Sequence, residues 1–188
     1  MRSSALRQSR TWQGPQRRLS VSINVSANQL SRATFVEYLR RLIAELEVDP
    51  TLIELEVTES VIIEGAGDAR ESLYEIAALG VGIAIDDFGT GYSGLAYLKR
   101  LPIDTVKIDQ SFVRDLTVDP DDKAIVTAIV AMAKSLGVEV VAEGVETEEQ
   151  LEELKRLGCT RAQGFLLARP MTAAGVTRFL GRATAAAE

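Results

Sequence analysis

The chain has 188 residues, of which 46% are apolar and 26% charged, and its net charge is −6. These values are those of one soluble globular domain, and the acidic surplus disfavours DNA binding, which needs basic surface. The absence of histidine excludes Ser-His and Cys-His catalysis, and the absence of a long apolar run or a signal peptide predicts a cytoplasmic protein with no membrane segment.

Short β-branched runs alternate with amphipathic stretches along the whole chain. The six predicted strands are residues 19–24, 52–57, 82–86, 104–108, 138–143 and 160–164. This alternation predicts a parallel sheet with helices outside it. The strand ends recur about every 28 residues, close to the ~30 residues per unit of a (β/α)₈ barrel. That barrel has eight strands, however, and a doubly wound open sheet is the alternative for six.

The helices between these strands carry start and stop signals. Thr147 and Gln150 form the pattern of a capping box that opens a helix. Left-handed C-terminal caps are expected at the glycines that follow a leucine, which are Gly80, Gly137 and Gly158. In the stretch 123–137, helical spacing predicts one buried apolar face made of Ile125, Ala128, Ile129, Met132 and Leu136.

Polar side chains close the predicted strands. They are Asn24, Glu56, Asp86, Asp87, Lys107, Glu143 and Gln163. In a β/α barrel the C-terminal strand ends converge on one mouth, so we expect these side chains to meet there. An all-oxygen ligand set selects Mg²⁺ or Mn²⁺, and a carboxylate pair can serve two ions about 4 Å apart, which suits phosphoester hydrolysis. Lys107 would then position the attacking water, with Glu146 in support.

Each of these residues also has a purely structural interpretation. The two aspartates fit a turn with an N-cap, and Asn24 and Gln163 fit buried amides that are fully hydrogen-bonded. Lys107 could pair with Asp104 or Asp109. Glu143 and Glu146 could be helix-start acids. Because all of the residues fall at matching strand ends, we favour the metal site.

The segment 83–94, "IAIDDFGTGYSG", contains a G-x-G-x-x-G pattern at Gly89, Gly91 and Gly94. Such a pattern binds the pyrophosphate of a dinucleotide when it opens the first βα unit. Here it lies in the middle of the chain behind two aspartates, which would repel phosphate. We therefore interpret it as a loop that swings close to metal-binding aspartates.

Five long motifs together resemble the EAL-domain cyclic di-GMP phosphodiesterases. They are "INVSANQL", "LIELEVTES", "IAIDDFGTGYSGLAYLKRLPIDTVKIDQSFV", "VVAEGVET" and "RAQGFLLARPM". The resemblance runs from about residue 5 to 182. It implies a (β/α)₈-type barrel with one antiparallel strand, a homodimer, and hydrolysis of cyclic di-GMP to linear pGpG with two Mg²⁺ or Mn²⁺ ions.

The resemblance also assigns roles to individual residues. The metal ligands by this resemblance are Asn24, Glu56, Asp86, Asp87 and Glu143. Lys107 matches the lysine that positions the attacking water, with Asp109 close by, and Glu146 and Gln163 match supporting residues. Glu59 matches the glutamate that anchors the glycine loop, which couples the metals to the dimer interface and includes Phe88, Gly89, Thr90 and Gly91.

The chain departs from the family at its N-terminus. The strand that carries the Glu-Ala-Leu motif is not found, so we expect a single EAL-type domain over 1–188 with six of eight strands. Residues 1–18 are expected to be a helix end and linker, and 183–188 a disordered tail. Sensory or diguanylate cyclase modules could precede the domain in a longer gene. The alternatives to an active cyclic di-GMP phosphodiesterase are a catalytically impaired EAL domain that acts as a cyclic di-GMP receptor or protein-interaction module, and an unrelated sugar-phosphate barrel enzyme.

Overall fold

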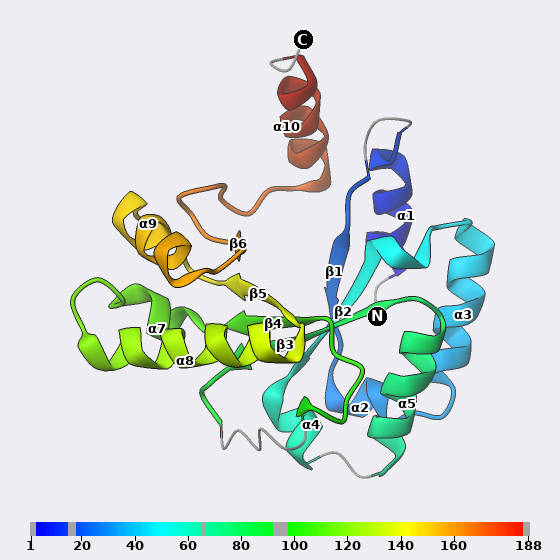
Figure 1. Ribbon diagram of the computed structural model, residues 1–188. Coiled ribbons are helices and arrows are strands. Elements are labelled where there is room, and N and C mark those ends of the chain that lie inside the picture. Colours follow the sequence, from blue (N-terminus) through cyan, green and yellow to red (C-terminus); the bar gives the residue numbers. More distant parts are fainter. Residues whose placement is uncertain (1–2, 15–17, 65–66, 92–97, 186–188) are drawn as a thin grey trace.

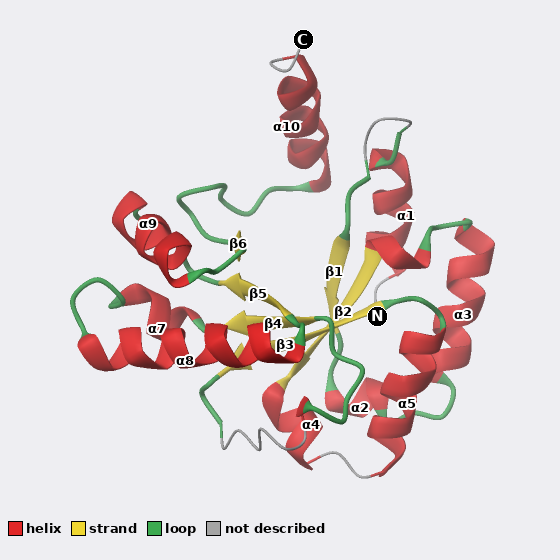
Figure 2. Ribbon diagram, in the orientation of Figure 1, coloured by secondary structure: helices red, strands yellow, loops and turns green. Residues whose placement is uncertain are grey.

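A computed structural model describes residues 3–14, 18–64, 67–91 and 98–185 (Figure 1). Within these residues six strands form one sheet in sequence order: β1 (Val21–Asn24), β2 (Ile53–Thr58), β3 (Gly82–Phe88), β4 (Thr105–Ile108), β5 (Glu139–Ala142) and β6 (Arg161–Ala162). Every neighbouring pair is parallel. The sheet curls like half of a barrel with helices outside it, as Figure 2 shows, so the predicted architecture is confirmed.

The helices of the described residues alternate with the strands. They are α1 (Ser3–Trp12), α2 (Ala27–Leu30), α3 (Phe35–Leu46), α4 (Glu59–Glu64), α5 (Gly67–Ala78), α7 (Gln110–Arg114), α8 (Pro120–Leu136), α9 (Glu148–Leu157) and α10 (Ala173–Ala185), with a 3₁₀ turn at Pro50–Leu52. None of them is long and apolar enough to cross a membrane. The tail predicted at 183–188 lies partly outside the described residues and stays a prediction.

The predicted end signals of the helices are confirmed. Thr147 Oγ1 accepts a hydrogen bond from Gln150 N at 3.2 Å, and Gln150 Oε1 accepts one from Thr147 N at 3.0 Å, which completes the capping box of α9. The three cap glycines have positive φ values of 82°, 71° and 90° at Gly80, Gly137 and Gly158.

The predicted buried face of α8 is wrong. Ile125 and Leu136 are 38% and 37% exposed. The buried residues of this helix are instead Val126, Ile129, Val130 and Ala133. Apolar residues occupy more than one side of α8. Their spacing therefore fits two overlapping apolar faces, one with Ile125 and Leu136 and one with Val126 and Val130. Contact with β4 and β5, which is not visible in the local sequence, selects the face that carries the two valines.

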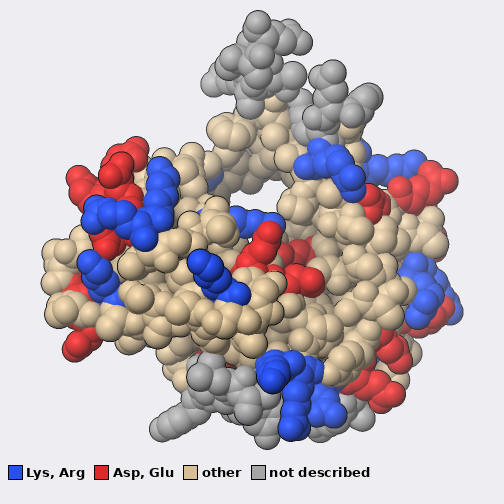
Figure 3. Space-filling view, in the orientation of Figure 1, with Lys and Arg blue, Asp and Glu red and all other residues tan. Residues whose placement is uncertain are grey.

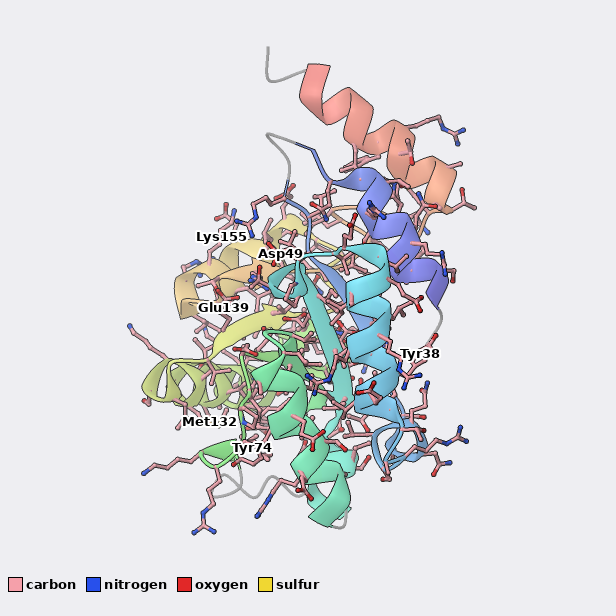
Figure 4. All side chains as sticks on the ribbon, turned by 90° about the vertical axis from the view of Figure 1, so that its right-hand side faces the viewer. Tyr38, Asp49, Tyr74, Met132, Glu139 and Lys155 are labelled. Atoms are coloured by element: carbon pink, nitrogen blue, oxygen red, sulfur yellow. The ribbon has the colours of Figure 1, made fainter. Side chains whose placement is uncertain are left out.

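The outer face of the sheet is apolar and carries two hydrophobic clusters. One joins β1–β3 to α1, α3 and α5, and the other joins β3–β5 to α7, α8 and α9. β3 contributes to both, with Ile83 in the first and Ile85 in the second, and both residues are fully buried. Figure 4 shows α3 and α5 covering their side of the sheet, with Tyr38 and Tyr74 on its outer surface.

The inner, concave face of the sheet is polar. Glu54 accepts hydrogen bonds from Ser22 Oγ and Thr105 Oγ1, both at 2.8 Å. Farther along the sheet, Glu139 pairs with Arg161. Because side chains alternate between the two faces of a strand, Glu54 and Glu56 both point inward while Leu55 points to the helices. The outer face therefore stabilises the fold, and the inner face is available for chemistry.

Substitution of Gly164 with Ala tests how tightly the chain after β6 packs. A Cβ atom at this position would lie 2.1 Å from the carbonyl oxygen of Val145. Because backbone cannot yield as a flexible side chain does, we expect Gly164→Ala to lower the free energy of unfolding by about 2–3 kcal/mol. Chemical denaturation measures this change. The control is Gly181→Ala on α10, where a Cβ would meet nothing within 4 Å, and an equal loss in both variants would contradict the prediction.

Candidate metal centre

Lys107 lies at the centre of the C-terminal strand ends. Its Nζ contacts Glu56 Oε1 at 2.8 Å, Asp86 Oδ1 at 2.8 Å and Glu143 Oε1 at 2.7 Å. These three carboxylates come from β2, β3 and the end of β5, and the lysine comes from β4 between them. The Lys107 side chain is 5% exposed. Parallel register thus gathers three carboxylates, distant in sequence, around one ammonium.

Burial and ion pairing oppose each other in this cluster. Burial lowers the pKa of Lys107, but the hydrogen bonds that its ammonium donates to Asp86, Glu143 and Glu56 outweigh burial and hold that pKa above its ordinary value. Burial raises the pKa of Glu56 and of Glu143, although Lys107 partly offsets the rise. Lys107 therefore stays protonated throughout the neutral range and acts as a fixed positive charge.

The adjacent aspartates share one side of the sheet because the strand is irregular between them. Consecutive residues of a regular strand point to opposite faces. Here the register of β3 with β4 shifts between Ile85 and Phe88, and Asp87 has a positive φ of 54°. Ligand atoms of Asp86, Asp87 and Glu143 consequently lie within 4.8 Å of one another. Burial, followed by the charges of Asp86 and Asp109, raises the pKa of Asp87.

The remaining predicted residues border this cluster. Asn24 ends β1 in register with Glu56, and the backbone N of Gln163 donates to Ala142 O at 2.8 Å, which places Gln163 beside the end of β5. Asp109 caps α7 by accepting from Ser111 N at 2.9 Å. Glu146 lies three residues after Glu143. The side chains of Asn24, Gln163 and Glu146 are exposed, while Asp109 is partly buried.

Glu59, the first residue of α4, contacts the start of the glycine loop. Its Oε2 accepts a hydrogen bond from Gly89 N at 3.2 Å, and a Cβ at Gly91 would lie 3.2 Å from its carboxylate. Phe88 is 2% exposed, and Thr90 Oγ1 donates to Asp87 O at 2.8 Å. Gly94 lies outside the described residues. The predicted link from this loop to a dimer interface stays a prediction.

The residues present fit hard divalent cations. The cluster offers carboxylate oxygens and, at its border, an amide oxygen, which are ligands that Mg²⁺ and Mn²⁺ prefer. Several carboxylates at this spacing repel one another, and one lysine offsets part of that repulsion. Figure 3 shows Asp and Glu atoms gathered beside a hollow in the middle of this face. A cation could therefore reach the Asp and Glu carboxylates beside this hollow from solvent.

Two structural interpretations from the sequence are corrected. Lys107 does not pair with Asp104 or Asp109 among the ion pairs of the described residues. Asp104 accepts a hydrogen bond from Ile83 N at 2.9 Å instead.

The second interpretation concerns Gln150, which the sequence predicts only as a helix cap. It is 6% exposed and additionally contacts α7, a role signalled only by a polar residue at a buried helical position.

The EAL domain family matches residues 1–170, and this chain belongs to that family. It is 49% identical over 170 residues to the bifunctional diguanylate cyclase/cyclic di-GMP phosphodiesterase MucR of Pseudomonas aeruginosa, covering 90% of this chain and 25% of that protein. The chain spans about a quarter of the length of the curated relatives it matches. Several of these relatives are named cyclic di-GMP phosphodiesterases.

Solved structures agree with this family. The EAL domain of Mycobacterium smegmatis DcpA superposes with a TM-score of 0.91 at 42% identity, covering 96% of this chain and 81% of that one. The MucR phosphodiesterase in complex with cyclic di-GMP gives 0.88 at 47% identity, covering 93% and 71%. Klebsiella pneumoniae BlrP1, in a complex with manganese and cyclic di-GMP, gives 0.84 at 34% identity, covering 91% and 43%.

Replacement of Lys107 with Met tests whether this ammonium holds the cluster together. The variant keeps most of the unbranched side chain but leaves Glu56, Asp86 and Glu143 without their shared cation. Breaking a buried pair by removing one partner costs about 3–5 kcal/mol, and we expect a loss of this size in the free energy of unfolding in EDTA. The matched control is Lys123→Met, whose half-exposed amine pairs with Glu153 and should contribute about 1 kcal/mol or less. Similar losses in both variants would contradict the prediction.

Proposed function

We propose that this domain hydrolyses cyclic di-GMP to linear pGpG. The observation that carries the proposal is the convergence of Glu56, Asp86 and Glu143 on Lys107 in a family whose relatives are named for this activity. Asp87 adds a further carboxylate within 4.8 Å of Asp86 and Glu143. The substrate class comes from the relatives, and the local chemistry is consistent with it.

The side chains divide into metal ligands and groups that act on water. The proposed ligands are Asn24, Glu56, Asp86, Asp87 and Glu143. Two Mg²⁺ or Mn²⁺ ions, when bound, would activate a water and stabilise charge on the phosphate. Lys107 cannot accept a proton while its partners keep it charged, so its Nζ would donate hydrogen bonds that orient the water.

A carboxylate must then receive the proton that the water loses. Asp109 lies close enough to the proposed ligand Asp87 to raise the pKa of the latter, so Asp109 is the proposed acceptor. The water oxygen bonds to phosphorus, one phosphate–ribose P–O bond breaks, and the released ribose oxygen takes up a proton. Glu146 and Gln163 at the border would hold the turns around this water.

Hydrolysis by the purified chain tests the proposal. We expect cyclic di-GMP to be converted to pGpG with Mn²⁺ and not with EDTA, as measured by chromatography and mass spectrometry. Glu143→Gln should lower the rate by about 100-fold or more, because a ligand should matter at least as much as the outer residues of a metal site. Glu148→Gln, the same change at an exposed residue of α9, is the control and should leave the rate within about twofold.

Other outcomes separate the alternatives. Tight binding of cyclic di-GMP without turnover would identify a receptor and overturn the proposal. Turnover that Glu143→Gln and Glu148→Gln leave equally intact would overturn the assigned site. We also propose a homodimer, which light scattering would test. Because the relative MucR is named as a bifunctional diguanylate cyclase and phosphodiesterase, we further propose that a diguanylate cyclase module accompanies the domain in the full protein.

A further inference from the structure

Gln150 connects the turn after β5, which begins at the site residue Glu143, to helix α7, which Asp109 caps. Its Oε1 accepts hydrogen bonds from Glu146 N at 2.8 Å and Thr147 N at 3.0 Å. Its Nε2 donates to Arg114 O, the last residue of α7, at 3.0 Å. The side chain is buried, with 6% of the residue exposed. One carboxamide therefore joins the turn after β5 to the short helix after β4.

The orientation of this carboxamide is dictated by its partners. Two backbone N–H groups face one end and a carbonyl oxygen faces the other. A flipped amide would point its NH₂ group at two donors and its oxygen at an acceptor, losing all three bonds. Only an amide satisfies this combination, because a carboxylate has no donor for Arg114 O and an apolar side chain has neither function.

The turn after β5 also packs closely against the first residue of α7. Gly144 has a positive φ of 71°, and a Cβ there would lie 2.5 Å from Gln110 Cβ. Gln110 opens α7 directly after Asp109, and Gly144 directly follows Glu143. The two contacts lie at opposite ends of the interface: Gly144 against the first residue of α7, and Gln150 against its last. Together they leave the turn and the helix little freedom to slide or rotate against each other.

We propose that Gln150 is a positioning residue, which holds the Glu143–Glu146 turn against the Asp109 turn so that Glu143 keeps its place in the metal centre. A conventional capping glutamine would need only the bond to the N-cap backbone. The bonds to Glu146 N and Arg114 O exceed that need. The first lies on the turn that begins at Glu143, and the second lies at the last residue of α7, the helix that Asp109 caps. This inference rests on the metal site proposed above.

Mn²⁺ affinity of the whole chain tests the inference without reliance on turnover. Free Mn²⁺ is measured by its electron paramagnetic resonance signal during titration. Gln150→Met keeps the shape of the side chain and removes all three bonds. Loss of an outer partner of a metal ligand typically weakens affinity 10–100-fold, so we expect the Mn²⁺ Kd to rise by about tenfold or more.

Thr147→Val is the matched structural control. It removes the hydroxyl cap of the same helix, which accepts from Gln150 N at 3.2 Å, but leaves the Gln150 carboxamide in place. We expect its melting temperature to fall while its Mn²⁺ Kd stays within about twofold of the unaltered chain. If the Mn²⁺ Kd rises in proportion to the loss of melting temperature in both Gln150→Met and Thr147→Val, Gln150 acts only through stability. That result would overturn the proposal.

Gln150→Glu separates positioning from charge. The added negative charge should by itself attract Mn²⁺ and lower the Kd. Positioning predicts the opposite, because the carboxylate cannot donate to Arg114 O and repels it. A Kd that rises as in Gln150→Met would support the proposal, and a Kd that falls or is unchanged would overturn it. If the unaltered chain binds no Mn²⁺, the proposed metal site itself is overturned. If the unaltered chain and all variants bind Mn²⁺ with equal Kd, only the positioning role of Gln150 is overturned.

Discussion

The contact of one lysine with three carboxylates is the constraint on which the rest of the structure depends. Glu56, Asp86 and Glu143 repel one another, and Lys107 between them is what allows the three strand ends to approach. The polar inner face can exist because the outer face buries enough apolar surface to hold the strands in parallel register. The packing of the helices on the outer face thus supports the charged cluster on the inner face.

Three turns that contain glycine, after β3, β5 and β6, form part of the rim of the site. Gly164 fits against the backbone of Val145, and Gly144 fits against Cα and Cβ of Gln110, so the turns after β4, β5 and β6 pack closely on one another. Gly89 is held differently, by a hydrogen bond from its N to Glu59. The second half of the sheet therefore has a rim built by close contacts at glycines, and the Glu59 carboxylate contributes to holding the loop after β3.

Much of this architecture could be predicted from the sequence. Strand positions, helix caps and the meeting of strand-end carboxylates follow from local patterns and from the geometry of parallel sheets. The rotation of α8 could not be predicted, because Ile125 and Val126 are equally apolar and only tertiary contact chooses between them. The positive φ of Asp87 and the reach of Gln150 to Arg114 likewise depend on distant backbone. Which three acids meet Lys107 required the actual register.

The division of the hydrophobic core at β3 has a consequence for how the molecule assembles. Ile83 belongs to the cluster of the N-terminal half and Ile85 to that of the C-terminal half. Each half can collapse around its own helices, as cooperative subunits of a fold commonly do. Glu56 belongs to the first half, and Lys107 and Glu143 belong to the second. The complete charged centre therefore cannot form within either half alone. It forms only when the two halves have packed together.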